Sequence, residues 1–516
     1  MKLFQTPSLG DFKPPLLNDE ATVGLVDGSL RYVDREHLNI CMQSYAAYLL
    51  DHPNATVSSD MLAIREAGNG ISAKDMFLPV QESALKKIAS VWRDKGFIEA
   101  VHATAEEDPA QVTKILHWIT TRLSRLFDLV DKLAFWNEGL PMLTYGSAAD
   151  IAITRDWATA IVRCLAWHPH CTRLALATRD DRIRVFCKNV QGAAVLRHSF
   201  QKSVSCLTWR PNSGRELAAA CQMGILIWKV ELGAASSSLS QALTLRQRGH
   251  APVTSVAWNP QGDLLVSCSP ANNNMYIWDT SRELAVPLKC VRGGGLCFAR
   301  WSHCGSRLLA ASTHSVFRIW NTGDGSSWKS EKWMVPNGRV AAACFGPDLT
   351  LLFVSTEVPE IVFSLPLQEN IFDLKNSGVN NDVKAATAII DLKKTILYSD
   401  QHEQQCLGGR VIAMEWDPTG KYLAIIFRDS PIVVVFAMKL QAGSIAADAA
   451  EGCLIKGFPG EVPNCMNFQQ DFDSNSDFGG ACLTIAWSSG RVQHFPLVNS
   501  NSVVHSSFTT NHLYIS

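Results

Sequence analysis

The sequence predicts an all-β fold built as a seven-bladed β-propeller, and two recurring strand endings carry this prediction. An apolar strand that ends in Trp-x-Pro or a close variant returns at Trp167, Trp209, Trp258, Trp301, Phe345 and Trp416. A second strand with an aromatic ending follows each of them, at Phe186, Trp228, Trp278, Trp320, Phe363 and Phe436, and a seventh ends at Phe495. Three of the intervals between neighbouring second endings are 42 or 43 residues, the length of one four-stranded blade. Seven second endings therefore predict seven blades.

We expect four segments along the 516 residues. They are an N-terminal hairpin with an irregular segment (1–82), a helical segment (83–140), the propeller (141–500) and a C-terminal tail (501–516). The hairpin is expected in TVGLVDGSLRYV, because the pair Asp27-Gly28 can supply the positive φ that a tight turn requires.

The helical segment has a clear start and a continuous apolar face. Asp108 is the N-cap of its longer helix, and Pro109 occupies the first helical position. Apolar residues then keep helical spacing for about six turns, at Val112, Ile115, Leu116, Ile119, Leu123, Leu126, Phe127, Val130 and Leu133. Because a face this wide must be buried, we expect the helices to pack against the propeller; a partner-binding helix is the alternative.

The third repeat shows the features of a WD40 blade most completely. Gly249-His250 opens it, Ser267 or Ser269 lies on its second strand, and Trp278 ends its third strand. In WD40 blades such residues form a hydrogen-bonded set together with an Asp in the next turn. Here that turn carries three asparagines (272–274), so the set is incomplete, and packing between blades must supply most of the coherence.

The recurring positions are interpreted as structural blade anchors rather than as a catalytic site. These anchors are Trp167, Trp209, Trp228, His250, Ser255, Trp258, Trp278, Trp301, Trp320 and Trp416. Ser255 lies in the middle of the expected strand PVTSVAW. No catalytic, cofactor-binding or metal-binding residue is assigned, and the partner-binding residues stay unassigned.

Composition argues against several classes of function. Lys and Arg number 47 against 48 Asp and Glu, so the net charge of −1 gives no overall attraction to nucleic acid or anionic lipid. The amino terminus does not resemble a signal peptide, and the longest apolar runs have strand length, below the ~20 residues of a membrane span. We therefore expect neither direct nucleic-acid binding nor membrane insertion.

Motif searches point the same way. The 15 cysteines include no CxxC pair, which favours free, buried thiols over a zinc site. No phosphate-binding loop, nucleophile elbow or H-E-x-x-H motif is present. The cluster of His168, His170 and Cys171 is expected to cap its own turn, and Asp180-Asp181 is expected to be a solvated turn pair. The chain is therefore predicted not to be an enzyme and to need no cofactor.

Two irregularities interrupt the repeats. The interval of 73 residues between Phe363 and Phe436 contains a blade-five excursion, at about 368–408, whose polar stretches QENIFDLKNSGVNND and LYSDQHEQQCLGG are expected to be exposed loops. Ring closure is the other question. We expect a strand within MLTYGSAADIAITRD (142–156) to supply the missing outer strand of the last blade.

The chain resembles the Aladin family of WD-repeat nucleoporins. The resemblance rests on RCLAWHPHCTRLALATRDDRIRVF (163–186), GHAPVTSVAWNPQGDLLVSCSP (249–270), VKAATAIIDL (383–392), LGGRVIAMEWDPTGKYLAI (407–425) and IAWSSGRVQHFPL (485–497). Non-repeat features coincide as well, among them the blade-five excursion, the N-terminal hairpin and the helix containing VWRDKGF (91–97).

The resemblance implies a non-catalytic structural component of the nuclear pore complex. Such a protein is held at the nuclear envelope by a transmembrane nucleoporin, contacts other nucleoporins, and supports nucleocytoplasmic transport of protein and RNA. The alternative is an adaptor propeller that presents substrates to a ubiquitin ligase or another multiprotein complex. A propeller enzyme with a metal in its central channel would need a repeated acidic or histidine position on the inner strands, which the repeats do not show.

Overall fold

The computed structural model describes most of residues 151–498 and shorter parts of the N-terminal third. The described ranges are 6–13, 20–34, 49, 52–53, 55–57, 62, 101, 104–105, 118–125, 151–188, 192–231, 241–290, 294–323, 328–335, 338–367, 386–398, 404–441, 444–472 and 480–498. The chain forms two compact units: Met1–Ser59 together with Ala152–Ser516, and Asp60–Ile151.

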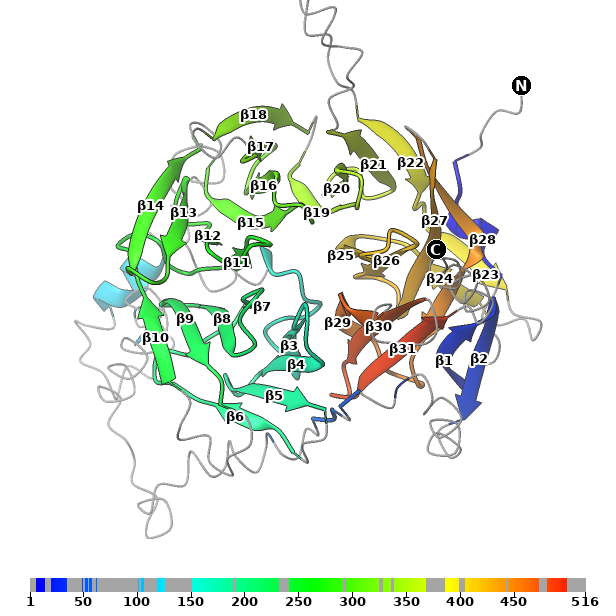
Figure 1. Cartoon of the computed structure of the whole chain (residues 1–516), viewed down its shortest axis with the longest axis horizontal. Helices are drawn as coiled ribbons and strands as arrows, with labels where there is room; N and C mark the ends of the chain where they lie inside the picture. Colours follow the sequence, from blue (N-terminus) through cyan, green and yellow to red (C-terminus); the bar gives the residue numbers. More distant parts are fainter. Residues whose placement is uncertain are drawn as a thin grey trace, which may run out of the picture. The chain divides into compact units, whose positions relative to one another are not determined.

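The first unit contains seven β-sheets arranged around a ring, as Figure 1 shows, so the predicted seven-bladed propeller is confirmed. In blades one to six the innermost strand comes first in the chain and its neighbours follow outward, and the three inner strands of blade seven follow the same order. Apolar strands become inner strands because both of their faces are covered by neighbouring blades. The innermost strands contact one another in sequence around the ring, and β3 contacts β29 where the ring closes.

Blades one to four each consist of four consecutive antiparallel strands. Blade one is β3 (Val162–Trp167), β4 (Arg173–Thr178), β5 (Ile183–Cys187) and β6 (Ala194–Leu196). Blade two is β7 (Cys206–Trp209), β8 (Glu216–Cys221), β9 (Gly224–Lys229) and β10 (Gln241–Leu245). Blade three is β11 (Ser255–Trp258), β12 (Leu265–Cys268), β13 (Asn274–Asp279) and β14 (Leu284–Lys289). Blade four is β15 (Leu296–Trp301), β16 (Arg307–Ser312), β17 (Val316–Asn321) and β18 (Lys329–Met334).

Blades five and six keep this pattern, and an extra hairpin lies between them in the chain. Blade five is β19 (Val340–Phe345), β20 (Thr350–Ser355), β21 (Ile361–Pro366) and β22 (Thr387–Asp391). The extra two-stranded sheet is β23 (Thr395–Tyr398) and β24 (Gln404–Leu407). Blade six is β25 (Val411–Trp416), β26 (Tyr422–Phe427), β27 (Ile432–Gln441) and β28 (Ser444–Lys456). Blade seven has β29 (Pro463–Phe468), β30 (Gly480–Trp487) and β31 (Val492–Val498).

The N-terminal hairpin completes blade seven. Strands β1 (Glu20–Val26) and β2 (Ser29–Asp34) extend its sheet to five strands, in the order β2-β1-β31-β30-β29. The expected turn forms, since both Asp27 and Gly28 have positive φ, at 50° and 71°. Strand β1 pairs with β31 in parallel, through Leu25 with Leu497 and Val26 with Val498.

The prediction that residues 142–156 close the ring is therefore wrong. Residues 151–156 form no strand, and 142–150 lie outside the described residues. The outer strand comes instead from the beginning of the chain, because the apolar, β-branched stretch of β1 buries its central residues against the neighbouring strands. The pairing of β1 with β31 could not be predicted from a local sequence pattern, because it joins positions more than 400 residues apart.

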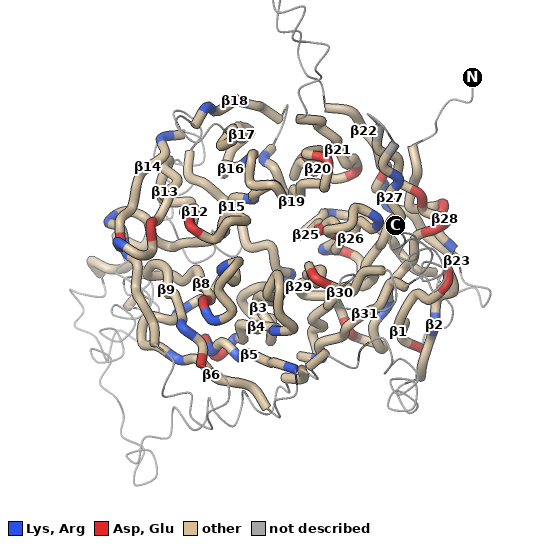
Figure 2. The backbone as a smooth tube through the Cα atoms, in the orientation of Figure 1, with Lys and Arg blue, Asp and Glu red and all other residues tan. Residues whose placement is uncertain are grey.

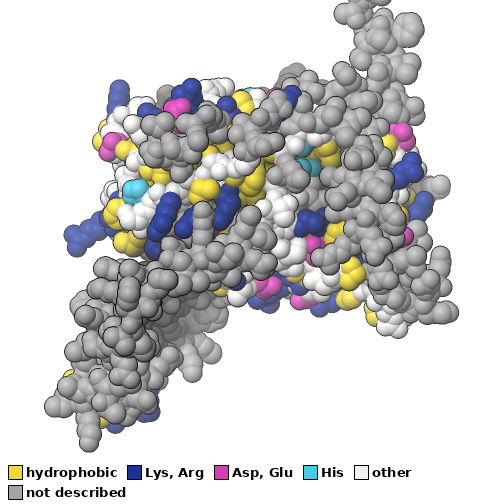
Figure 3. All heavy atoms as spheres, turned by 90° about the horizontal axis from the view of Figure 1, so that it is seen from below, with side chains coloured by type: hydrophobic (Ala, Val, Ile, Leu, Met, Phe, Trp, Pro, Cys, Tyr) yellow, Lys and Arg dark blue, Asp and Glu magenta, His cyan; other side chains and the backbone are white. Residues whose placement is uncertain are grey.

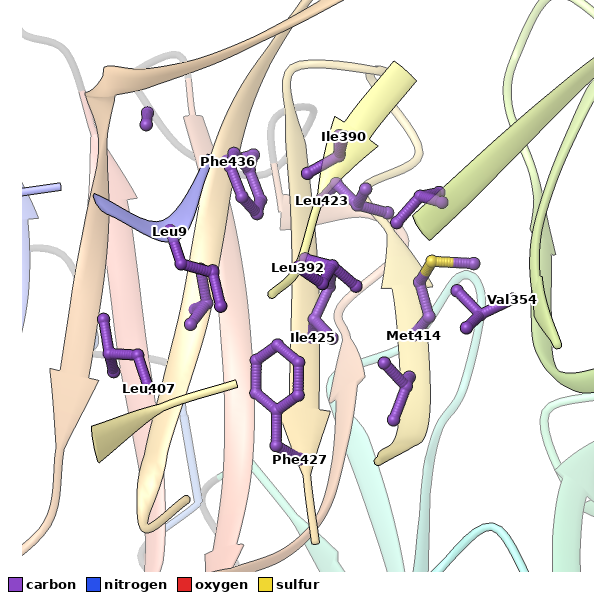
Figure 4. Packing of buried hydrophobic residues seen from close by; sticks show 14 of the residues in the cluster. Leu9, Val354, Ile390, Leu392, Leu407, Met414, Leu423, Ile425, Phe427 and Phe436 are labelled. Atoms are coloured by element: carbon purple, nitrogen blue, oxygen red, sulfur yellow. The ribbon is translucent and has the colours of Figure 1, made fainter. Parts of the chain in front are cut away.

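A second N-terminal segment, which we call the N-terminal strap (residues 7–12), packs on blades five and six. Ser8 forms a parallel bridge with Asp391, and Leu9 is fully buried. The ring of Phe12 packs edge-on against Phe436, with 4.9 Å between the ring centroids. Figure 4 shows Leu9 among the side chains of Leu407, Leu392 and Phe436. The strap thus belongs to the hydrophobic core that blades five and six share with the hairpin β23–β24.

The second unit contains the predicted helical segment, in which residues 101, 104–105 and 118–125 are helical. The start signal at Asp108-Pro109 and most of the predicted apolar face lie outside the described residues. In the described stretch Ile119 is exposed, whereas Thr120 and Ser124 are buried. That these helices pack on the propeller stays a prediction.

Candidate partner-binding surface and blade anchors

The tryptophans that end the inner strands tie neighbouring blades together. The indole N–H of Trp209 donates to the carbonyl oxygen of Ala166 at 3.1 Å, from blade two to blade one. Trp301 donates in the same way to Ala257 at 3.3 Å, from blade four to blade three. At the ring closure, Trp167 donates to the hydroxyl of Thr484 in blade seven at 2.8 Å. A buried indole N–H needs an acceptor, and here the preceding blade supplies it.

Two inner-strand anchors depend on other contacts. The indole N–H groups of Trp258 and Trp416 are buried and have no hydrogen-bond partner among the described residues. The guanidinium of Arg210 lies over the ring of Trp258, 5.1 Å from its centroid, so a cation–π contact holds this ring. Trp416 is buried within the apolar core shared by blades five and six.

The anchors at the third strands are also buried. Trp228 donates from its indole N–H to the side-chain oxygen of Gln201 at 2.9 Å, which holds the loop between blades one and two. Trp320 packs in the apolar cluster between blades three and four, and its indole N–H has no partner in the described structure. Both rings therefore serve the packing of the blades.

In blade three the hydrogen-bonded set of His, Ser and Trp forms, although the Asp that completes it in other WD40 blades is missing. The imidazole Nε2 of His250 lies 2.7 Å from the hydroxyl of Ser267, and the indole N–H of Trp278 donates to the same hydroxyl at 2.8 Å. Of the two serines that the sequence left open, Ser267 is the member of the set. Nδ1 of His250 is buried without a partner among the described residues, at the position where an Asp would accept. Burial lowers the pKa of His250 to about 4, so this imidazole is neutral at physiological pH.

Small hydroxyl residues just before the inner strands of blades two and three provide cross-blade hydrogen bonds that sequence reasoning missed. The hydroxyl of Thr254 donates to the carbonyl oxygen of Cys297 in blade four at 2.8 Å. Between blades two and three, the hydroxyl of Ser205 donates to the carbonyl oxygen of Val253 at 2.9 Å. A Ser or Thr immediately before an inner strand is the signal that could have identified both.

The turn pair in blade one is not solvated, so that expectation was wrong. The Asp180 carboxylate is nearly buried and pairs with Arg184 at 2.9 Å, and it accepts a further hydrogen bond from Thr178. Asp181 pairs with Arg163 at 2.8 Å. Although burial opposes ionisation, hydrogen bonds from Arg184 and Thr178 hold the pKa of Asp180 below its ordinary value. The adjacent acids therefore form structural ion pairs, one with Arg184 on the strand that follows the turn and one with Arg163 on the inner strand β3.

The histidine cluster behaves as expected. The backbone N–H of His170 donates to Nδ1 of His168 at 3.0 Å, and the other ring nitrogen of His168 lies 3.1 Å from the carbonyl oxygen of Ser213. The imidazole thus caps its own turn and reaches the next blade. Within the described residues, no group of three or more His, Cys, Asp or Glu side chains could hold a metal ion.

An ion pair connects the inner strands of two blades that are not neighbours in the ring. The guanidinium of Arg300 in β15 lies 2.9 Å from the carboxylate of Glu415 in β25, so blade four reaches blade six past blade five. The charge of Glu415 raises the pKa of Arg300 above its ordinary value. Elsewhere charges of both signs are interspersed around the ring, as Figure 2 shows.

The hairpin β23–β24 presents an exposed apolar face and is the candidate partner-binding surface. Ile396 and Tyr398, two residues apart on β23, are 49% and 60% exposed. The alternate residues Leu397 and Leu407 are buried in the core that contains the N-terminal strap. This alternation follows from the two-residue period of a strand. The stretch 397–409 is thus partly β-structure rather than the expected exposed loop, whereas 368–385 lies outside the described residues.

Comparison with known proteins shows to which family this propeller belongs. A family model described as the Aladin seven-bladed propeller matches residues 144–498, which includes every blade strand from β3 to β31. The chain belongs to the Aladin propeller family. The curated Aladin of Arabidopsis thaliana is 25% identical over 341 residues, covering 61% of this chain and 71% of that protein. The assignment supports a propeller scaffold of the Aladin type.

Two other similarities are shorter or less specific. The protein transport protein sec31 of Aspergillus oryzae is 24% identical over 198 residues, covering 36% of this chain and 15% of that protein. The crystal structure of the β-propeller domain of Cps50 (Swd1) from Myceliophteria thermophila has a TM-score of 0.46 and 16% identity. It covers 65% of this chain and 96% of that one. Among the described residues, no helix is long and apolar enough to cross a membrane.

Proposed function

We propose that this protein is a non-catalytic scaffold nucleoporin of the nuclear pore complex. The observation that carries the proposal is the match of residues 144–498 to the Aladin propeller family. The polar clusters described above form hydrogen bonds and ion pairs within the propeller. A rigid ring of this kind suits a scaffold, because it holds its loops in fixed positions for partners. In this role the protein supports nucleocytoplasmic transport of protein and RNA.

We further propose that a transmembrane nucleoporin holds the protein at the nuclear envelope through the blade-five excursion. The described part of the excursion contributes the exposed face formed by Ile396 and Tyr398. Large apolar side chains in adjacent exposed positions are characteristic of protein-binding surfaces. Because the opposite face of the same hairpin is buried in the core, this surface is presented on a fixed support.

The experiment is capture of the membrane nucleoporin from detergent-solubilised nuclear envelopes by the purified full chain. We expect Ile396→Asp/Tyr398→Asp to lose capture while the melting temperature stays near that of the wild type. The matched control is Leu284→Asp/Val286→Asp, which changes two similarly exposed apolar residues on one strand of blade three and should retain capture. Removal of residues 370–382 should also weaken capture.

Three results would overturn parts of this proposal. Normal capture by the Asp double variant would move the contact away from the hairpin. Normal capture by the shortened chain as well would move it to the helical segment. Recovery of a ubiquitin-ligase scaffold in place of nucleoporins would replace the function itself with the adaptor role.

A further inference from the structure

A compact cationic and apolar surface lies on the loops that join blades one, two and three. We call it the Phe200 surface, and it consists of residues 197–202, Met223 and 246–248. Phe200 and Met223 are 38% and 41% exposed. The same loops carry four exposed cations, Arg197, Lys202, Arg246 and Arg248. Figure 3 looks at the molecule from the lower edge of Figure 1, and there Lys and Arg side chains stand beside hydrophobic ones.

Specific contacts hold these residues together. The guanidinium of Arg246 lies over the ring of Phe200, 5.1 Å from its centroid, and the imidazole of His198 stacks on the same ring at 5.5 Å. The backbone N–H of Gln222 donates to the carbonyl oxygen of Lys202 at 2.9 Å, which places the turn containing Met223 beside the loop of Phe200. The surface is therefore formed by three loops with a fixed relation to one another.

The positive charge of this surface is not balanced locally. No Asp or Glu occurs in 197–205, 222–224 or 245–251. In the adjoining turn, Asp180 is paired with Arg184 and Asp181 with Arg163; Asp181 also interacts electrostatically with Lys202 and so offsets part of that one charge. None of the four exposed cations forms an ion pair with another described residue. This local excess contrasts with the net charge of −1 for the whole chain.

We propose that the Phe200 surface binds an acidic protein segment that carries apolar side chains. Carboxylates of the segment pair with the cations at the rim, and its apolar side chains contact Met223 and the edge of Phe200. A single-stranded nucleic acid is the less suitable ligand, because a base needs a free aromatic face on which to stack. His198 and Arg246 already occupy the ring of Phe200. The surface belongs to different blades from the exposed hairpin β23–β24, so it would serve a second partner.

The test is fluorescence anisotropy with the full chain and a labelled short peptide of alternating Glu and Leu. The wild-type chain should bind this peptide, with an affinity that falls as salt is raised. A charge-reversed variant, Arg246→Glu/Arg248→Glu, should bind it ~tenfold more weakly or worse, and Met223→Ser should also weaken binding. The matched control is Lys229→Glu/Lys332→Glu, which makes the same change in net charge at exposed lysines on β9 and β18 and should bind normally.

Other probes decide between the possible ligands. A peptide of alternating Glu and Ser should bind distinctly more weakly; equal binding would overturn the apolar part of the proposal. Tighter binding of a single-stranded RNA with the same charge, or of anionic vesicles, would replace the acidic segment with that ligand. Equal loss of peptide binding in the Lys229→Glu/Lys332→Glu control would show that only net charge matters and would overturn the site. Thermal melts of each variant confirm that a loss of binding is not a loss of folding.

Discussion

The hydroxyl of Ser255 accepts a hydrogen bond from the backbone N–H of Ala299 at 3.3 Å, and this contact joins the inner strands of blades three and four. Ser255 is also paired with Cys268 in the ladder of its own blade, and it is buried. One small residue thus connects three strands. A change at this position should act on the folding of the ring before it acts on any partner.

Ser255→Pro should strongly destabilise the propeller. Proline removes the backbone N–H from an inner strand and fixes φ, which costs ~3 kcal/mol or more. Ser255→Ala loses the cross-blade hydrogen bond alone and should cost ~1 kcal/mol. Urea unfolding measures both, and imaging of the tagged protein should show the proline variant away from the nuclear envelope. A proline variant that unfolds like the wild type yet leaves the envelope would identify Ser255 as an interface residue.

Acid should weaken the ring in part through His250. Its pKa is about 4 in the folded chain, against an ordinary value of 6.5, so the folded state favours the neutral imidazole. The associated stability is fully present above pH 6.5 and is lost as pH falls towards 4, amounting to ~3 kcal/mol. Urea midpoints between pH 7.5 and 4.5 should fall less steeply for His250→Gln than for the wild type. Identical slopes would contradict this role of His250.

Asp417 should oppose stability at neutral pH. Its buried carboxyl has a pKa raised to about 6 by desolvation, although Thr419 and the backbone N–H of Lys421 donate to it. Because the folded state favours the protonated form, stability falls as pH rises from about 4 through 6, by up to ~3 kcal/mol. Asp417→Asn should therefore stabilise the chain at pH 7.5 and have little effect at pH 4. Calorimetric melts at the two values test the sign, and destabilisation at pH 7.5 would refute it.

The N-terminal strap should contribute measurably to the stability of blades five and six. Leu9 is fully buried among Leu392, Leu407 and their neighbours, so Leu9→Ala should cost ~2–5 kcal/mol through the cavity that it leaves. Hydrogen exchange should rise first in β22 and β28, the strands that adjoin the strap. Lys13→Ala, just beyond the strap on an exposed residue, is the control and should leave both readouts unchanged.

The purified chain should remain in the supernatant when it is sedimented with anionic liposomes at physiological salt. Its net charge of −1 gives no general attraction to anionic headgroups, and the described residues include no membrane-crossing helix. Addition of the membrane nucleoporin to the liposomes should bring the chain into the pellet. Tight sedimentation with plain liposomes would contradict recruitment through protein contacts alone.

Repeat length and aromatic endings were sufficient to predict seven blades, because each blade needs the same apolar strands in the same order. The turn at Asp27-Gly28 could also be predicted from the sequence, because its requirement for positive φ concerns only these two residues. Contacts between positions far apart in the chain could not be predicted from the sequence. Neither the pairing of Leu25 with Leu497 nor that of Arg300 with Glu415 leaves a local pattern. The stretch 397–409 was taken for an exposed loop although it contains β24 and the end of β23, because each of these strands is only four residues long.

The pairing of β1 with β31 joins two strands that leave the ribosome far apart in time, because Leu25 and its partner Leu497 are separated by 472 residues (497 − 25). Synthesis proceeds at roughly 5–20 residues per second, so the hairpin waits on the order of half a minute or longer before its partner strand emerges. During that time six blades can stack, but the ring stays open and the apolar edge of β1 has no neighbour from blade seven. Nascent chains of this protein should therefore depend on chaperones until β31 has left the ribosome. Premature stop codons within the last blade should yield degradation substrates rather than shortened scaffolds.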